Sequence, residues 1–118
     1  METEARLPVA PHIFEILLAL SQGPRHGYRI IADVSERTGG GIVIGTSSLY
    51  AAIRQMLRDG LIEDAEPGEV EPSSGPPRRY YAITDLGSDV ARLEAQRLRG
   101  AVAAAEVLLG SAPTGTRL

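Results

Sequence analysis

Cysteine, tryptophan and lysine are absent from this 118-residue chain, and phenylalanine occurs once. Without cysteine, the chain forms no disulfide, no thiolate metal site and no thiol-based redox sensor. The two histidines, His12 and His26, are too few for a metal site without help from carboxylates, so we expect neither a metal nor a cofactor. Because every basic side chain is arginine, a single arginine is weaker evidence for a phosphate contact than usual.

Long hydrophobic runs and the sequence motifs of enzymes are also missing. The longest apolar run, Ile13 to Leu20, is too short to span a bilayer, and Glu2 and Glu4 make the N-terminus unlike a signal peptide. We therefore expect a cytoplasmic protein without membrane contact. Residues 39–41 are glycines, but they follow a predicted helix and lack the spacing of a phosphate-binding loop. With no paired carboxylates and no GxSxG or HExxH element, the sequence does not predict an enzyme.

The balance of charge is slightly acidic. The net charge of −3 excludes a bulk polyanion binder, so any contact with nucleic acid has to come from a local patch. Hydrophobic residues make up 43% of the chain, which is enough for one domain with a modest core.

The segment from Gly45 to Gly60 predicts a helix with two chemically different faces. Apolar residues recur at helical spacing on one face, at Leu49, Ala52, Ile53 and Met56. The opposite face carries Ser47, Tyr50, Ala51, Arg54 and Arg58. We expect Thr46 or Ser47 to cap the first turn and Gly60 to end the helix. Such a face suits the major groove of DNA; the alternative is an ordinary solvent-exposed helix surface.

The neighbouring segments predict a winged helix-turn-helix, which is a mainly α fold with a small β-hairpin. We expect helices from Pro8 or Pro11 to Leu20, from about Arg25 to Thr38, and from Asp85 to about Leu109 with Thr84 as its cap. We expect the two hairpin strands over 61–65 and 78–83, with a Pro-, Gly- and Ser-rich loop between them; 42–44 is compatible with a further short strand.

The last predicted helix carries a heptad-like seam, formed by Ala91, Ala95, Leu98, Val102, Ala105 and Leu109. At 1.5 Å per residue this helix is about 37 Å long, more than so small a domain can cover. We therefore expect a homodimer in which the seam is joined by Phe14 and Leu18; the alternative is a helix that folds back on its own core. The predicted organisation is a DNA-binding domain over 8–83, a dimerisation helix over 84–110, and flexible tails over 1–7 and 111–118.

Three motifs in this order resemble the PadR family of bacterial transcriptional regulators: "HGYRI", "SSLYAAIRQMLRDGLIE" and "GPPRRYYAITDLG". The resemblance covers roughly residues 11 to 100. It implies a homodimeric repressor on a palindromic operator, released by a small molecule or another signal. The hydroxyl-Leu-Tyr motif at the start of the family's recognition helix falls on Ser48, Leu49 and Tyr50. Thr46 stands where the family usually has proline, so the operator sequence is expected to differ.

The resemblance also implies a basic pair at the foot of the wing, on Arg78 and Arg79. The wing tip carries Glu66, Glu69 and Glu71 without any arginine, so it is not expected to enter an A·T-rich minor groove. The predicted DNA-binding set is Thr46, Ser47, Ser48, Tyr50, Arg54, Arg58, Arg78 and Arg79.

Two further hypotheses accompany DNA binding. A small-molecule effector could occupy a pocket at the dimer interface, lined by Phe14, Leu17, Leu18, Leu98 and Val102; the alternative for these residues is ordinary dimer core. A winged helix can also serve as a protein-interaction adaptor without DNA binding, and the acidic wing suits a basic partner.

Overall fold

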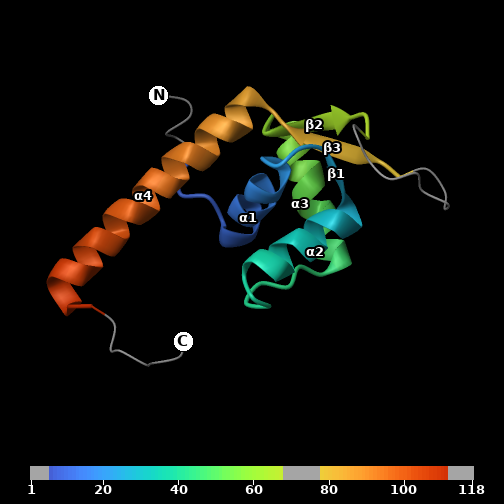
Figure 1. The fold of residues 1–118 in the computed structure, drawn as a ribbon. Coiled ribbons are helices and arrows are strands. Elements are labelled where there is room, and N and C mark those ends of the chain that lie inside the picture. The colour runs from blue at the N-terminus through green and yellow to red at the C-terminus, as the bar shows by residue number, and fades with distance from the viewer. Residues whose placement is uncertain (1–5, 68–77, 112–118) are drawn as a thin grey trace.

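The computed structural model describes residues 6–67 and 78–111, and its arrangement is shown in Figure 1. The elements are α1 (Pro11–Leu20), β1 (Arg25–His26), α2 (Gly27–Arg37), α3 (Thr46–Arg58), β2 (Ile62–Ala65), β3 (Tyr80–Ile83) and α4 (Asp85–Leu109). The predicted mainly α fold with a small wing is confirmed. Among the described residues, no helix is both long enough and apolar enough to cross a bilayer.

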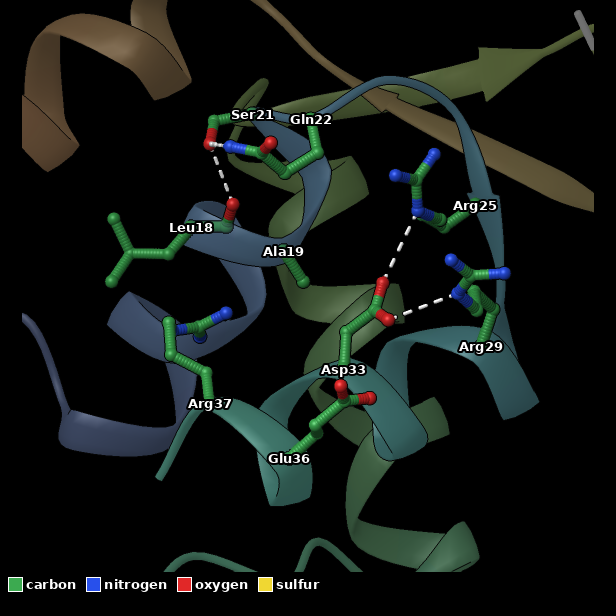
Figure 2. Close-up of a pocket in the computed structure, with 9 residues that line it drawn as sticks. All are labelled: Leu18, Ala19, Ser21, Gln22, Arg25, Arg29, Asp33, Glu36 and Arg37. Carbon is green, nitrogen blue, oxygen red and sulfur yellow. Dashed lines mark hydrogen bonds and ion pairs between the residues drawn. The ribbon is translucent and has the colours of Figure 1, made fainter. Parts of the chain in front are cut away.

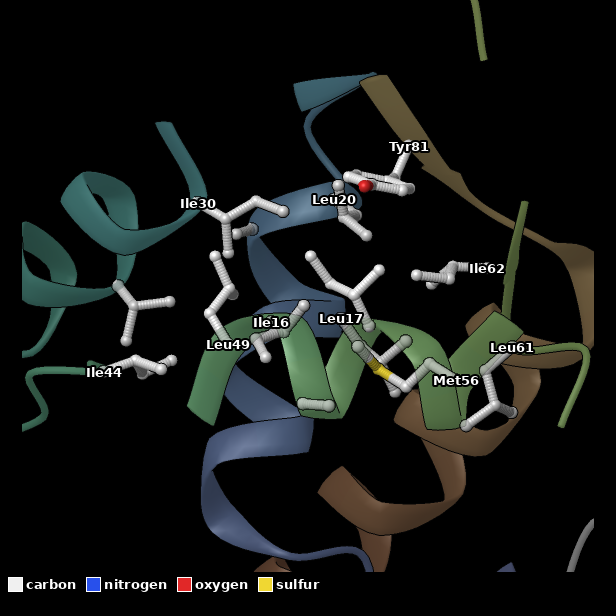
Figure 3. Close-up of a cluster of buried hydrophobic side chains, with 14 of the residues drawn as sticks. Ile16, Leu17, Leu20, Ile30, Ile44, Leu49, Met56, Leu61, Ile62 and Tyr81 are labelled. Carbon is white, nitrogen blue, oxygen red and sulfur yellow. The ribbon is translucent and has the colours of Figure 1, made fainter. Parts of the chain in front are cut away.

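The core lies where α1, α2 and α3 meet beneath the small sheet (Figure 3). The predicted apolar face of α3 points into it: Leu49, Ala52, Ile53 and Met56 are all at most 4% exposed. Ile16 and Leu17 of α1 are fully buried in the same cluster. The helical spacing of apolar residues therefore places α3 with one face in the core and the other toward solvent.

The sheet has three antiparallel strands in the order β1-β3-β2, one more than the predicted hairpin. The register pairs Arg25 with Tyr81 and His26 with Tyr80, while Ile62 pairs with Ile83. The second helix begins at Gly27, within the predicted start near Arg25 to Tyr28, but the strand that Arg25 and His26 form before it was not predicted. The open edge of β3 offers backbone hydrogen-bond partners, so these two residues stay extended and α2 begins at Gly27. Residues 42–44 form no strand.

The sequence predicted the C-terminal end of α3 correctly but not the residue that caps its N-terminal end. Gly60 has a φ of +75° and follows the last turn, as expected for the residue that ends a helix. The predicted cap by Thr46 or Ser47 is wrong, because the capping position is Gly45 and no side chain bonds to the first turn. Thr46 is already inside the helix, one residue too late to cap it.

The helix α4 begins and ends at the predicted residues, and Thr84 caps it by accepting a 3.0 Å hydrogen bond from the backbone N–H of Gly87. The Thr84 hydroxyl also donates to the carbonyl of Gly60 at 2.6 Å. Gly87 packs directly on the carbonyl of Leu61, where a Cβ would have no room. These contacts attach the first turns of α4 to the end of α3 and the start of β2, and the helix then runs away from the other helices (Figure 1).

The predicted tails lie mostly outside the described residues. Leu7, which the sequence placed in the N-terminal tail, is partly buried against the core. The ordered part of the chain therefore begins before the predicted boundary at residue 8.

Candidate nucleic-acid interface

The outward face of α3 presents most of the side chains that the sequence predicted there. Thr46, Ser47 and Ser48 are exposed on the first turn, and Arg54 and Arg58 are exposed further along. Neither arginine forms an ion pair with the described residues, whereas Arg25, Arg29, Arg37, Arg79, Arg92 and Arg97 all do. This face therefore combines unpaired positive charge with hydroxyls that can both donate and accept.

Tyr50 does not lie as predicted. Its ring is partly buried against the core, and its phenol lies over Gly27 at the start of α2. A Cβ on Gly27 would be 2.5 Å from the phenol oxygen and 3.2 Å from a Leu49 methyl carbon. The tyrosine fills the space that the missing side chain of Gly27 leaves, so it holds α3 against α2. The prediction that its side chain stands free on the outer face is wrong.

At the foot of the wing, Arg79 is paired across the strands with Asp64. Its Nη2 donates to one carboxylate oxygen at 2.9 Å, and its Nε donates to the other. The hydrogen bonds from Arg79 lower the pKa of Asp64, and the guanidinium also lies 5.3 Å from the centre of the Tyr81 ring. The charge of Arg79 is therefore already neutralised within the wing, which leaves Arg78 as the unneutralised member of the predicted basic pair.

Arg78 lies beside the start of α2 rather than in open solvent. Its Nη1 is 3.0 Å from Nε2 of His26, and its guanidinium lies 5.8 Å from the centre of the Tyr28 ring. The pairing of β1 with β3 brings these residues together, although 52 positions separate His26 from Arg78 in the sequence. Sequence analysis missed this cluster because it did not predict β1.

His26 is fixed from two further sides. Its Nδ1 accepts a 3.2 Å hydrogen bond from the backbone N–H of Arg29, which caps α2. The edge of its ring meets the Tyr80 ring at a centroid distance of 5.4 Å. Burial lowers the pKa of His26, and the positive charges of Arg78 and Arg29 lower it further. The imidazole is therefore neutral at pH 7.

A strip of charge continues along α2 next to this cluster. Asp33 accepts from Nε of Arg25 at 3.2 Å and from Nε of Arg29 at 2.9 Å, as Figure 2 shows. One carboxylate thus serves two guanidinium groups. Arg25, Arg29 and Arg78 thus gather three guanidinium groups around β1 and the start of α2, even though the whole chain is acidic.

The five residues of the predicted effector pocket do not surround one cavity within this chain. Phe14 and Leu98 line a hollow of about 560 Å³. It lies between α4 on one side and α1, with the residues just before it, on the other. Leu17 and Leu18 line a separate hollow of about 190 Å³. Val102 borders neither hollow, because it lies further along α4, where it is 57% exposed among the described residues.

The predicted dimerisation residues differ in how exposed their side chains are. Five of them are partly buried, namely Phe14, Leu18, Ala91, Ala95 and Ala105. Leu98, Val102 and Leu109 are 36%, 57% and 83% exposed. Within the described ranges, no three His, Asp or Glu residues are arranged to hold a metal ion.

Comparison with known proteins identifies this arrangement. Residues 16–93 match the transcriptional regulator PadR-like family. The chain belongs to this family. It is 38% identical over 77 residues to uncharacterized protein X of Lysinibacillus sphaericus, a match that covers 64% of this chain and 68% of that protein.

Solved PadR structures have the same fold. A PadR family regulator from hypervirulent Clostridium difficile R20291 superposes with a TM-score of 0.72 at 27% identity, covering 86% of this chain and all (100%) of that one. A PadR-like regulator from Bacillus cereus gives a TM-score of 0.66 at 26% identity, covering 85% of this chain and 92% of that one. This PadR-family protein is therefore a DNA-binding transcriptional regulator with a winged helix, and it is not an enzyme.

Proposed function

We propose that this PadR-family regulator is a repressor that binds a palindromic operator as a homodimer, with α3 in the major groove. The supporting observation is the outer face of α3, where Arg54 and Arg58 have no carboxylate partner among the described residues. Arginines that are not neutralised by the protein are available to phosphates and guanine edges. Acting on the chromosome would place the protein in the cytoplasm.

The first turn of α3 adds contacts of a second kind. Because Gly45 caps the helix without a side chain, the hydroxyls of Thr46, Ser47 and Ser48 are not used within the helix. The backbone N–H groups of this turn lack side-chain acceptors and carry the positive end of the helix dipole. A helix that enters the groove with this end presents both sets of donors to bases and phosphates.

The proposed dimer rests on α4. The apolar side chains of Leu98, Val102 and Leu109 lie on one seam, and they are 36%, 57% and 83% exposed. A second copy, joined through this seam and through Phe14 and Leu18, would bury them. Two copies related by a two-fold axis would present two α3 helices, and the expected half-site separation is about one helical turn, ~34–36 Å. We assign 8–83 to DNA binding and 84–110 to dimerisation.

An apolar effector is proposed for the hollow that Phe14 and Leu98 line. Its volume of about 560 Å³ lies within the usual range of ligand pockets, and its lining also includes Pro8 and Pro11. Because α4 forms one wall, a ligand there would change how α4 packs and thus the separation of the two α3 helices. The alternative occupant is a side chain of the partner subunit.

The experiment that tests the proposal is a gel shift with DNA from upstream of the protein's own gene. We expect binding at low salt, a log–log salt slope of order −6 for a dimer that neutralises about six or seven phosphates, and strong weakening by Arg54→Ala or Arg58→Ala. Arg92→Ala is the matched control, since Arg92 lies on α4 and pairs with Asp89.

Absence of any shift at low salt would overturn the proposal. If a pull-down then recovered one stoichiometric protein partner, the adaptor function would replace DNA binding.

A further inference from the structure

The two ring nitrogens of His26 both face hydrogen-bond donors. The backbone N–H of Arg29 lies 3.2 Å from Nδ1, and the guanidinium Nη1 of Arg78 lies 3.0 Å from Nε2. A neutral imidazole has one donor nitrogen and one acceptor nitrogen, and neither a backbone N–H nor a guanidinium can accept. Whichever tautomer forms, one N–H of His26 therefore points at another donor.

The helix cap decides which nitrogen carries the proton. The backbone N–H of Arg29 is fixed by α2 and has Nδ1 of His26 as its acceptor, so Nδ1 is unprotonated. The proton of the neutral ring is then on Nε2, beside the exposed side chain of Arg78. Protonation of both nitrogens is disfavoured, because burial and the two neighbouring arginines lower the pKa of His26.

Two N–H donors, on His26 Nε2 and on Arg78, thus lie side by side, and no acceptor from the described residues lies between them. Both side chains are held in place: the His26 ring meets Tyr80 edge-on, and the Arg78 guanidinium lies over Tyr28, which is itself 61% exposed. Arg25 and Arg29 lie nearby, and both donate to the carboxylate of Asp33. The missing partner of these donors is an oxyanion that can approach from solvent.

The geometry points to a phosphate-binding site at the junction of β1, α2 and β3, in which Nε2–H of His26 and the guanidinium of Arg78 donate to oxygens of one phosphate group. Tyr28 acts as the positioning residue for Arg78. This inference rests on the proposed function, because its intended occupant is a phosphodiester of the DNA backbone. An inorganic phosphate ion presents the same oxygens, so the test has to separate the two sources.

Variants separate the phosphate contact from the structural role of His26. Asn at position 26 can still cap α2 with its side-chain oxygen, but it is too short to offer a donor where Nε2–H lies. His26→Asn is therefore expected to unfold at the same temperature as the wild type and to bind DNA about tenfold more weakly, as for loss of one hydrogen bond to a charged group. A purely structural His26 would leave DNA affinity unchanged in this variant.

The salt dependence distinguishes the two donors. A random-sequence duplex serves as the probe, because a phosphate contact does not depend on base sequence. Arg78→Ala should lower affinity by about tenfold or more and reduce the log–log salt slope by ~0.9 for each protomer. His26→Asn should leave the slope unchanged because it removes no charge. Arg92→Ala, which removes one charge from α4, should change neither quantity.

If His26→Asn and Arg78→Ala both bind the duplex like the wild type while Arg54→Ala binds weakly, the site is refuted and the proposed function stands. If the wild-type protein binds no duplex at low salt, the proposed function fails, and the phosphate site is then decided by nitrogen NMR of the His26 ring.

In a His12→Gln background, His26 is the only histidine, so its two ring nitrogens can be observed directly. We expect the proton on Nε2 in the free protein, and a shift of this nitrogen when the duplex is added. A shift with inorganic phosphate alone would identify a site for the free ion, and a shift with neither probe would overturn the inference.

Discussion

The two halves of α4 have opposite surroundings. In the first half, Gly87, Val90 and Glu94 are buried, with Val90 fully enclosed. In the second half, Val102, Val107 and Leu108 are 57%, 85% and 80% exposed. Apolar residues in the first half stabilise the folded chain itself, whereas those in the second half gain nothing until another surface covers them. One helix thus serves two purposes, with the boundary near Glu94.

Gly87 and Gly100 lie in the two halves of α4 and differ in the same way. The largest expected effect on stability comes from substituting Gly87. Gly87→Ala would drive a methyl group into the carbonyl of Leu61 and the side chain of Ile83. We expect a loss of about 3 kcal/mol or more in the free energy of unfolding, measured by urea denaturation, because backbone cannot move aside cheaply.

Gly100→Ala is the matched control in the second half, where nothing lies within 4 Å of an added Cβ. It should raise stability by about 0.5–1 kcal/mol, as alanine does for glycine in an exposed helix. Equal effects at the two positions would contradict the division of α4 into an attached half and a free half.

The second prediction concerns the exposed seam. Val102→Glu should convert the dimer to a monomer in sedimentation velocity while leaving the winged domain folded, since a buried charge without a partner is strongly unfavourable at an interface. Ala104→Glu, about 200° around the helix from Val102, should leave the dimer intact. A dimer that tolerates the change at Val102 would show that α4 pairs through another face.

The third prediction concerns the contact between α2 and α3 in the winged domain. Gly27→Ala would place a Cβ within 2.5 Å of the Tyr50 phenol. Displacing the ring should cost about 1–3 kcal/mol in stability and tilt α3, which we expect to weaken DNA binding about tenfold. The control for stability is Gly100→Ala, because no atom lies within 4 Å of a Cβ there. DNA affinity like that of the wild type would show that Tyr50 does not orient α3.

The smallest expected effect is a pH dependence of the free energy of unfolding. It comes from Glu94, at the boundary between the two halves of α4. Glu94 is only 2% exposed and accepts two hydrogen bonds from Arg97, at 2.8 and 2.7 Å. These bonds lower its pKa from the usual 4.5, and the backbone N–H of Val9 contributes to the lowering, while burial opposes it. A lowered pKa means that the stabilisation is present above the unfolded-state value and is lost as pH falls through the folded-state value.

The wild type should therefore lose about 1 kcal/mol more than Glu94→Gln between roughly pH 5 and pH 3 in thermal or urea unfolding. Asp89→Asn, which removes the carboxylate of an exposed ion pair with Arg92, should show no such difference. Parallel pH profiles for the wild type and Glu94→Gln would mean that Arg97 does not stabilise the charged form.

The sequence predicted the elements whose signals are local. Helical spacing identified the buried face of α3, and Thr84 and Gly60 marked a helix start and a helix end, because capping and the left-handed conformation depend on single residue types. The motifs were also sufficient to indicate the PadR family.

The predicted cap of α3 was a local error of one residue, whereas the other errors share one physical cause, which is contact between residues far apart in the chain. The β1 strand at Arg25 and His26 exists because β3 pairs with it, and neither residue has a strong strand preference. Tyr50 turns toward α2 because Gly27 leaves room. Arg79 reaches Asp64 because the strand register places Asp64 opposite Tyr81, two residues after Arg79. Spacing along one helix carries no information about any of these partners.

The contact between Tyr50 and Gly27 also limits how this protein can be regulated. Because the Tyr50 ring fills the space beside Gly27, α3 cannot rotate about its own axis unless α2 moves with it. The pair therefore moves as one rigid block. If the proposed operator binding is regulated, α2 and α3 would then change position together relative to α4, and α3 would not move alone.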